Sequence, residues 1–201
     1  MKRKKIKPKF FQSSDVVNIA QQLIGCRIFT LINDELTSGV ITETEAYAGY
    51  GDKACHAHLG KFTNRTSVMY KPGGIAYIYL CYGIHHLFNV VTNTNGHADA
   101  ILIRAFEPDK GLKTMKKRRQ KTKFDKTLTS GTGNVSQALG LNLNHNQKSV
   151  CSKTIWFEKA KGNTADIVAT TRVGVDYAGK DAKLPWRFYD QKSNFVSVKK
   201  K

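Results

Sequence analysis

The sequence predicts a single compact α+β domain with a largely antiparallel, curved β-sheet, a protruding β-hairpin and flanking helices. Its 201 residues are 40% hydrophobic, which suits one domain with a substantial core. Strand candidates outnumber helix candidates, and many connections between them are short. No internal repeat or Pro/Gly/Ser-rich linker divides the chain, so we expect one domain over residues 1–201, with flexible basic ends at 1–8 and 198–201.

The first elements are a helix and two strands. Residues 14–26, SDVVNIAQQLIGC, have apolar residues at helical spacing, and Ser14 is a suitable N-cap. The next segments, 27–32 and 38–47, have the composition of strands, and Asn33-Asp34 between them predicts a turn.

The second of these strands carries two acids and a tyrosine on one face. Glu43, Glu45 and Tyr47 alternate with Thr44 and Ala46, so their side chains share one side of the sheet. Neighbouring carboxylates raise one another's pKa, and burial adds to this, which favours a proton-transfer role. The alternative is a salt-bridged strand edge beside arginines, and spacing alone does not choose between the two.

A hairpin is predicted next. The KPGG turn leads into a strand at 75–81, YGIHH at 82–86 forms the tip, and 87–92 returns. An exposed tyrosine at a hairpin tip has little value for a core. In a basic protein, Tyr82 therefore suggests a wedge that enters between stacked bases. The alternative is that Tyr82 folds back onto the domain.

The remaining elements follow the hairpin. Residues 99–108 predict a strand interrupted by Arg104, which must be paired if buried, and we expect it beside Glu43 or Glu45. A very basic helix is predicted at 111–120. The glycine-rich segment 129–141 leads into a short helix whose first N–H groups can hold a phosphate, although the Walker pattern is absent. Further strand candidates are IWFEK, IVATTRVGV and FVSVKK.

The charge indicates a polyanionic partner. The net charge is +18, from 33 Lys and Arg against 15 Asp and Glu, and basic residues cluster as KRKK, KKRRQKTK and a terminal KKK. Such runs give salt-dependent affinity for phosphates. The alternative is a solvated, solubilising surface.

No apolar run approaches the roughly 18 residues that cross a bilayer, and the basic N-terminus lacks the apolar segment of a secretory signal. We therefore expect a cytoplasmic protein that binds nucleic acid and no membrane.

Two other functions fit parts of this pattern. A zinc hydrolase or nucleobase deaminase would draw ligands from Asp52, Cys55, His56, His58, His85 and His86, but the signature HxE…PCxxC is absent. A non-catalytic nucleic-acid-binding module would explain the charge and the aromatics.

The four cysteines contain no CxxC pair and predict reduced, mostly buried thiols.

Several long motifs resemble one family. ITETEAYAG, KPGGIAYIYLCYGIHHLFNVV, ILIRAFEP and the late TTRVGVDYAG…PWRFY are similar to segments of the alkyladenine/3-methyladenine DNA glycosylases. The similarity runs in order over nearly the whole chain, from FFQSSDVVNIAQQLIG to NFVSV. It departs from the family at Asn64, where many relatives have proline, at the GIHH tip, and at two apparent extra residues between Asn89 and Arg104.

The resemblance implies a role for each matching residue. Glu45 would be the general base that deprotonates the attacking water, and Arg104 would help to position that water. Tyr82 would intercalate, and Arg65 would contact the DNA backbone. The implied base-pocket residues are Tyr47, His56 and Tyr79, which would sandwich the flipped base, and Asn89, which would disfavour guanine.

The resemblance also implies the reaction. The enzyme would flip an alkylated or deaminated purine from double-stranded DNA and hydrolyse its N-glycosidic bond, leaving an abasic site. A cationic alkylpurine is a good leaving group, and electron-rich rings attract it. We expect no metal and no organic cofactor, and a monomer suits DNA scanning. No lysine is obviously placed as an amine nucleophile, so we expect no strand cleavage.

Overall fold

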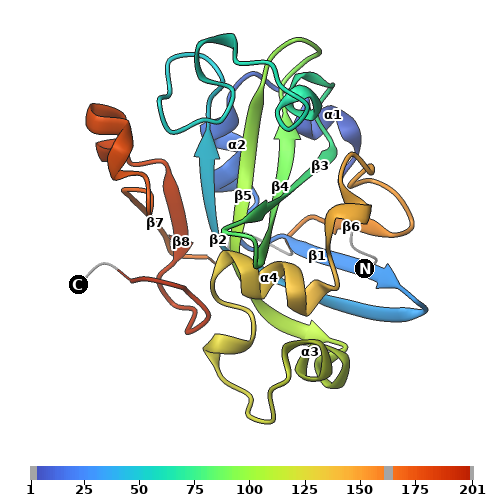
Figure 1. Cartoon of the computed structure of the whole chain (residues 1–201). Coiled ribbons are helices and arrows are strands. Elements are labelled where there is room, and N and C mark those ends of the chain that lie inside the picture. The colour runs from blue at the N-terminus through green and yellow to red at the C-terminus, as the bar shows by residue number, and fades with distance from the viewer. Residues whose placement is uncertain (1–3, 161–164, 200–201) are drawn as a thin grey trace.

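The computed structural model describes residues 4–160 and 165–199. The strands are β1 (Arg27–Ile32), β2 (Glu35–Tyr47), β3 (Ile75–Cys81), β4 (His85–Thr92), β5 (Asp99–Lys110), β6 (Ile155–Glu158), β7 (Ile167–Thr170) and β8 (Arg187–Asp190). They form one antiparallel sheet in the order β3-β4-β5-β2-β1-β6, and β8 pairs with both β2 and β7 (Figure 1). The predicted α+β class and antiparallel sheet are confirmed.

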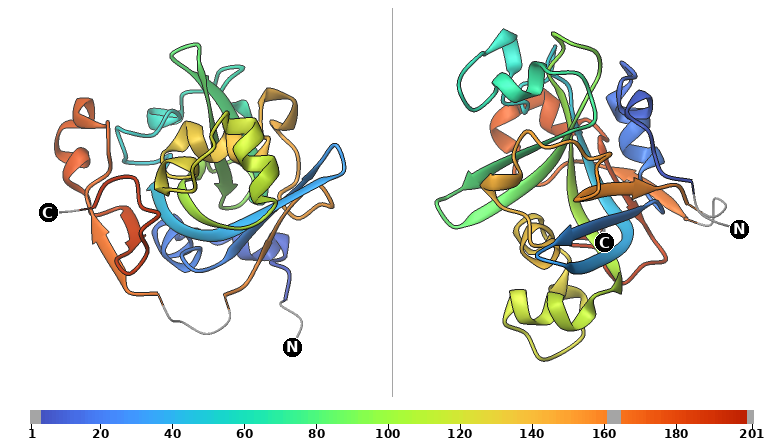
Figure 2. Two further views of the ribbon diagram at one scale, coloured as in Figure 1. Left: turned by 90° about the horizontal axis from the view of Figure 1, so that it is seen from below. Right: turned by 90° about the vertical axis from the view of Figure 1, so that its right-hand side faces the viewer.

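Short helices cover both sides of the curved sheet. The α-helices are α1 (Pro8–Phe11), α2 (Val16–Gln22), α3 (Leu112–Arg119) and α4 (Thr132–Leu139), and the 3₁₀ helices are η1 (His58–Gly60), η2 (Ser67–Tyr70), η3 (Lys126–Leu128), η4 (Leu143–His145) and η5 (Asp176–Lys183). Figure 2 shows β2 curving between α2 on its outer side and α4 and α3 on its inner side. None of the helices in the described ranges is long and apolar enough to cross a membrane.

The long strand β2 organises the sheet because it changes partners along one edge. It pairs with β5 on one side, while on the other its first half pairs with β1 and Glu43–Glu45 pair with β8. The register against β5 shifts between Ile41 and Glu43 and again between Glu43 and Thr44. Such bulges bend a strand and re-aim its side chains. Both acids therefore lie where the partner of β2 along this edge changes from β1 to β8.

The predicted hairpin β3–β4 is present and projects from the body of the sheet (Figure 2). Its turn is tighter than expected, because His85 and His86 belong to β4 rather than to the tip. The N–H of Ile84 donates to the carbonyl of Cys81, and the two residues between them, Tyr82 and Gly83, have φ of +50° and +72°. Positive φ at both central residues is the geometry of a type I′ hairpin turn.

Three boundaries differ from the sequence prediction. Helix α2 spans only Val16–Gln22, and Asp15 rather than Ser14 caps it by accepting the N–H of Asn18. Strand β2 begins at Glu35, directly after the predicted Asn33-Asp34 turn.

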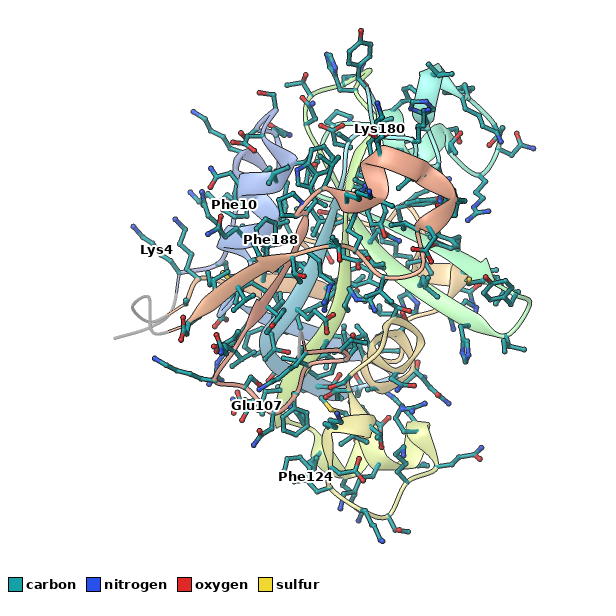
Figure 3. All side chains as sticks on the ribbon, turned by 90° about the vertical axis from the view of Figure 1, so that its left-hand side faces the viewer. Lys4, Phe10, Glu107, Phe124, Lys180 and Phe188 are labelled. Carbon is teal, nitrogen blue, oxygen red and sulfur yellow. The ribbon has the colours of Figure 1, made fainter. Side chains whose placement is uncertain are left out.

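The predicted strand at 195–200 is wrong for its described part, because the N–H of Ser197 donates to the Glu43 carboxylate instead of a strand neighbour. From the C-terminal part of the chain, the strand that pairs with β2 is β8. Figure 3 labels Phe188 in β8 and Lys180 in the neighbouring η5.

The chain ends are partly held by the sheet. Residues 1–3 and 200–201, which belong to the predicted flexible ends, lie outside the described residues. Within the rest of those ends, Ile6 is 3% exposed, its N–H donates to the carbonyl of Phe157, and Lys5 bridges to Glu158. At the other end, the carbonyl of Val198 accepts from Arg187. Ile6 and Val198 are thus held by contacts with the sheet, and the flexibility expected for 1–8 and 198–201 stays a prediction.

Candidate active site

A pocket of about 460 Å³ opens between the hairpin, the end of β2 and the segments before η1 and η5. This volume is in the range of small-molecule sites. Seven of the eight predicted site residues line it, although they come from distant parts of the chain: Tyr47, His56, Arg65, Tyr79, Tyr82, Asn89 and Arg104. The eighth, Glu45, lies directly behind this lining.

Glu45 is fully buried and is held by three donors that line the pocket or neighbour it. Its Oε2 accepts from the Tyr47 hydroxyl (2.8 Å) and from Nη1 of Arg104 (3.2 Å), and its Oε1 accepts the N–H of Val173 (2.8 Å). A carboxylate offers about four lone-pair positions. With a single donor, the Oε1 of Glu45 therefore keeps an unused acceptor position.

Glu43 is equally buried, but most of its partners lie away from the pocket. Its Oε1 accepts from Nε of Arg104, Nη1 of Arg187 and Oγ of Ser197, and its Oε2 accepts the N–H of Ser197. Arg187 and Ser197 do not line the pocket, whereas all three donors to Glu45 do. Glu43 is therefore an ion-paired acid of the sheet, and Glu45 is the acid in contact with the pocket lining.

Arg104 joins the two carboxylates, as its buried position in β5 predicted. Its Nε meets Glu43 at 2.9 Å and its Nη1 meets Glu45 at 3.2 Å. Burial acts to lower the pKa of Arg104, but Glu45 and Glu43 outweigh burial and the pKa is raised. The guanidinium therefore stays charged beside Glu45. Arg104 also lines the pocket, where it can donate to a bound group.

Aromatic rings form the pocket walls. The rings of His56 and Tyr79 meet edge-on with centroids 4.8 Å apart, and Nδ1 of His56 lies 2.9 Å from the Tyr77 hydroxyl. Burial, with Arg65 and Lys61, lowers the pKa of His56 to about 4. The imidazole is therefore neutral near pH 7. The ring itself therefore adds no positive charge to this wall.

Arg65 lies inside the pocket mouth rather than on an open backbone-binding surface. Its guanidinium sits 4.3 Å from the Tyr79 ring centroid, and its Nη2 approaches the His56 ring nitrogens at 3.2 and 3.4 Å. The residue as a whole is solvent-exposed. A planar cation thus already occupies the face of Tyr79, the arrangement that cation–π attraction favours.

Asn89 and Tyr82 complete the predicted set. Asn89 is 4% exposed, and its Nδ2 donates to the carbonyl of Tyr77, which fixes the amide in the pocket wall. Tyr82 is 92% exposed at the hairpin tip, so it does not fold back onto the domain in this structure.

Sequence reasoning missed the network that supports the pocket. Arg172 donates two hydrogen bonds to the Asp52 carboxylate (2.5 and 2.8 Å) and one to the carbonyl of Ala46. Its guanidinium also packs over the ring of Tyr47, 4.8 Å from the centroid. This pair fastens the segment before His56 to the end of β2, and it places the next residue, Val173, against Glu45. The only sequence signal was an arginine in TTRVGV, with no pattern to indicate its burial.

The side chains considered as zinc ligands are bonded to other groups or lie apart from one another. Both carboxylate oxygens of Asp52 are bonded to Arg172. Burial raises the pKa of Cys55 to about 12, so its thiol is neutral. Among the described residues, no three His, Cys, Asp or Glu side chains gather as metal ligands would. All four cysteines are free; Cys26 and Cys55 are buried, and Cys81 and Cys151 are half-buried.

Comparison with known proteins identifies the family. Residues 9–194 match the family model described as methylpurine-DNA glycosylase. Relatives named 3-methyladenine DNA glycosylase include those of Chlamydia pneumoniae, 46% identical over 89% of this chain and 91% of the relative, and Chlamydia felis, 48% identical over 89% and 92%. That of Natranaerobius thermophilus is 43% identical over 96% and 99%. The chain therefore belongs to the methylpurine-DNA glycosylase family.

Proposed function

We propose that this chain is a monofunctional DNA repair glycosylase that acts on alkylated or deaminated purines flipped out of duplex DNA. The proposal combines family membership with a buried carboxylate behind an aromatic pocket. The observation that carries it is the contact of Glu45 with three groups of the pocket lining, since a general base must lie within reach of the proton that it accepts. Within this function we expect a monomer that needs no cofactor.

The proposed chemistry is one hydrolytic displacement. Glu45 accepts a proton from a water held beside Oε1, and that water oxygen forms a bond to C1′ of the flipped nucleotide. The bond from C1′ to the purine nitrogen breaks, and its electron pair leaves with the base. For an alkylated, cationic purine this pair neutralises the ring. The carboxylate also favours the oxocarbenium-like transition state at C1′. The charged Arg104 guanidinium holds Glu45 and orients the water.

Binding of the base requires Arg65 to move. The guanidinium over Tyr79 occupies the ring face that a cationic purine would use. Because Arg65 is exposed, it can swing outward and meet a backbone phosphate while the base replaces it on the ring. Tyr47, His56 and Tyr79 then enclose the base, and Asn89 crowds the exocyclic amino group of guanine.

The hairpin presents Tyr82 as the wedge. An exposed aromatic on a projecting turn can enter from the minor groove and fill the gap left by the flipped base. The turn places the side chain of Tyr82 next to the pocket, which it also lines.

Glu45→Gln tests the function. We expect this variant to bind duplex DNA with a single lesion as the wild type does and to lose excision by at least about 100-fold, the contribution typical of general-base catalysis. The measurement is release of free base under single-turnover conditions, on separate duplexes carrying 3-methyladenine, 7-methylguanine, hypoxanthine or ethenoadenine.

The matched control is Glu107→Gln, the same change on an exposed residue of β5 (Figure 3), which should retain full activity. Near-wild-type excision by Glu45→Gln would remove Glu45 from the role of base. If the wild-type protein bound nucleic acid but released no base from any of the duplexes, the non-catalytic binding module would be the correct interpretation.

A further inference from the structure

We propose that a second groove, on the far side of the hairpin from the base pocket, binds the backbone of the DNA strand opposite the flipped nucleotide. This inference rests on the proposed function. The groove has a volume of about 850 Å³ and lies between the hairpin, α4, η4 and the β1–β2 turn. The side chains that matter are Ile84, His85, Arg118, Asn144, His145 and Lys148.

The hairpin and the start of α4 form the ridge between the two cavities. Tyr82 and Thr132 line the base pocket, whereas Ile84 and Gly133 line the second groove. The ridge is tightly packed: a Cβ at Gly133 would lie 2.9 Å from the His85 ring. A glycine at this position therefore lets His85, at the tip end of the hairpin, lie directly against α4.

The groove presents hydrogen-bond donors and positive charge. Lys148 and Asn144 are exposed, and their side chains bond to no other described residue. The His145 Nδ1 lies 3.3 Å from the Asn142 nitrogen and 3.0 Å from the Asn142 Oδ1, so Nε2 is the ring nitrogen left outside the capping box. The one acid of the lining, Glu35, is paired with Arg118 at 3.4 Å. Lysine, histidine and asparagine are side chains that contact phosphate oxygens in protein–DNA complexes.

The geometry of a duplex selects the occupant. The minor groove is about 6 Å wide and has one strand on each side. If Tyr82 enters this groove and the nucleotide from one strand turns into the base pocket, that strand lies on the pocket side of the ridge. The other strand then lies on the side of Ile84 and Lys148. The second groove is a donor-rich channel on that side.

The test compares duplex and single-stranded DNA that contain the same stable abasic analogue. We expect Lys148→Ala to weaken duplex binding about fivefold, to flatten the slope of log K against log salt by about 0.9 for one lost phosphate contact, and to leave single-strand binding within twofold of wild type. Lys153→Ala, an exposed lysine outside the groove, is the matched control and should change neither. Both variants should keep the wild-type melting temperature.

A second measurement identifies the strand. Single methylphosphonates, which lack the phosphate charge, are placed along each strand of the duplex. A neutral linkage in the opposite strand should weaken the wild type but not Lys148→Ala. Three outcomes would overturn the inference. They are equal loss of duplex and single-strand binding, no loss of either, and a methylphosphonate in the lesion strand whose effect disappears in Lys148→Ala. Base release by the wild type is assayed in parallel, so that a failure of the proposed function is seen separately from a failure of this one.

Discussion

At the scale of single residues, the site depends on which donors hold each buried acid. Glu43 and Glu45 are both fully buried two residues apart in β2. The three donors to Glu45 all line the pocket, whereas three of the four hydrogen bonds to Glu43 come from Arg187 and Ser197, which lie outside that lining. Removing the charge of a buried acid with several charged partners leaves those partners uncompensated.

Glu43→Gln should therefore affect folding more than chemistry. We expect it to lower the free energy of unfolding by about 3 to 5 kcal/mol, and the melting temperature by roughly 10 °C for a chain of this size. Glu45→Gln, with one cationic partner, should lose less stability and far more excision. Thermal denaturation of both variants beside the excision assay checks this pair, and equal stability losses with equal activity losses would contradict it.

His56 should make stability depend on acid pH. Its pKa is lowered from 6.5 to about 4, first by burial and then by Arg65 and Lys61. Between these values the unfolded chain binds a proton that the native state does not, so native stability falls as the pH drops through this window. We expect His56 to account for a loss on the order of 2 kcal/mol from pH 7 to 4.

His56→Gln should reduce this loss, and His97→Gln, which changes an exposed ring, should not. Urea denaturation at pH 7, 5.5 and 4.5 measures the difference between the variants. Identical pH profiles of wild type and His56→Gln would show that His56 is not the group that titrates.

At the scale of elements, the hairpin and the branch point of β2 have different tasks. The hairpin projects Tyr82 and separates the two cavities. Strand β2 holds both acids at the point where its partner changes from β1 to β8. Because the tip packs against little of the core, substitutions there should alter DNA binding without altering stability.

Tyr82→Ala should weaken binding to a duplex with an abasic analogue by roughly 5- to 100-fold, since stacking of an aromatic on a base contributes about 1 to 3 kcal/mol. Tyr50→Ala, which removes an equally exposed ring outside the pocket, is the control and should bind as the wild type does. Anisotropy at one salt concentration measures both, and an unchanged affinity for Tyr82→Ala would count against the wedge.

At the scale of the whole molecule, the positive charge is not all available to DNA. Within the basic run 116–123, Arg118 donates to Ala138 and Glu35, and Arg119 donates to Leu128, Thr127 and Gln137. These arginines join α3 to α4 and η3. The side chains of Lys117 and Lys123 are exposed and form no hydrogen bond or ion pair with another described residue, although Lys123 interacts electrostatically with Asp125. Their charges can therefore meet a polyanion.

Replacing Lys117 and Lys123 with alanine should flatten the salt dependence of duplex binding by up to about 0.9 for each lysine that contacts a phosphate, with no change in melting temperature. Arg119→Ala should instead lower the melting temperature, because it leaves the Leu128 carbonyl and the Gln137 Oε1 without their donor. Filter binding between 50 and 200 mM salt and thermal denaturation separate the two classes, and a stability loss in the lysine variant would contradict this division.

The sequence determined the features that depend on local order. Alternation placed β1, β3 and the site end of β2 correctly, the turn residues predicted both hairpins, and the interrupted pattern of β5 predicted that Arg104 is paired with an acid. The family resemblance supplied the residues of the pocket, and seven of them do line one cavity. Their roles stay predictions until the variants are measured.

Only the tertiary structure decided which carboxylate contacts the lining of the pocket. The donors that distinguish Glu45 from Glu43 are Val173 and Ser197, which lie 128 and 154 residues along the chain from the acids they bind. The Asp52–Arg172 pair and the strand β8 are likewise contacts between segments that the sequence keeps far apart. Strand and helix periodicities report only which face of an element is apolar. Which distant groups meet on that face is fixed by the packing of the whole chain.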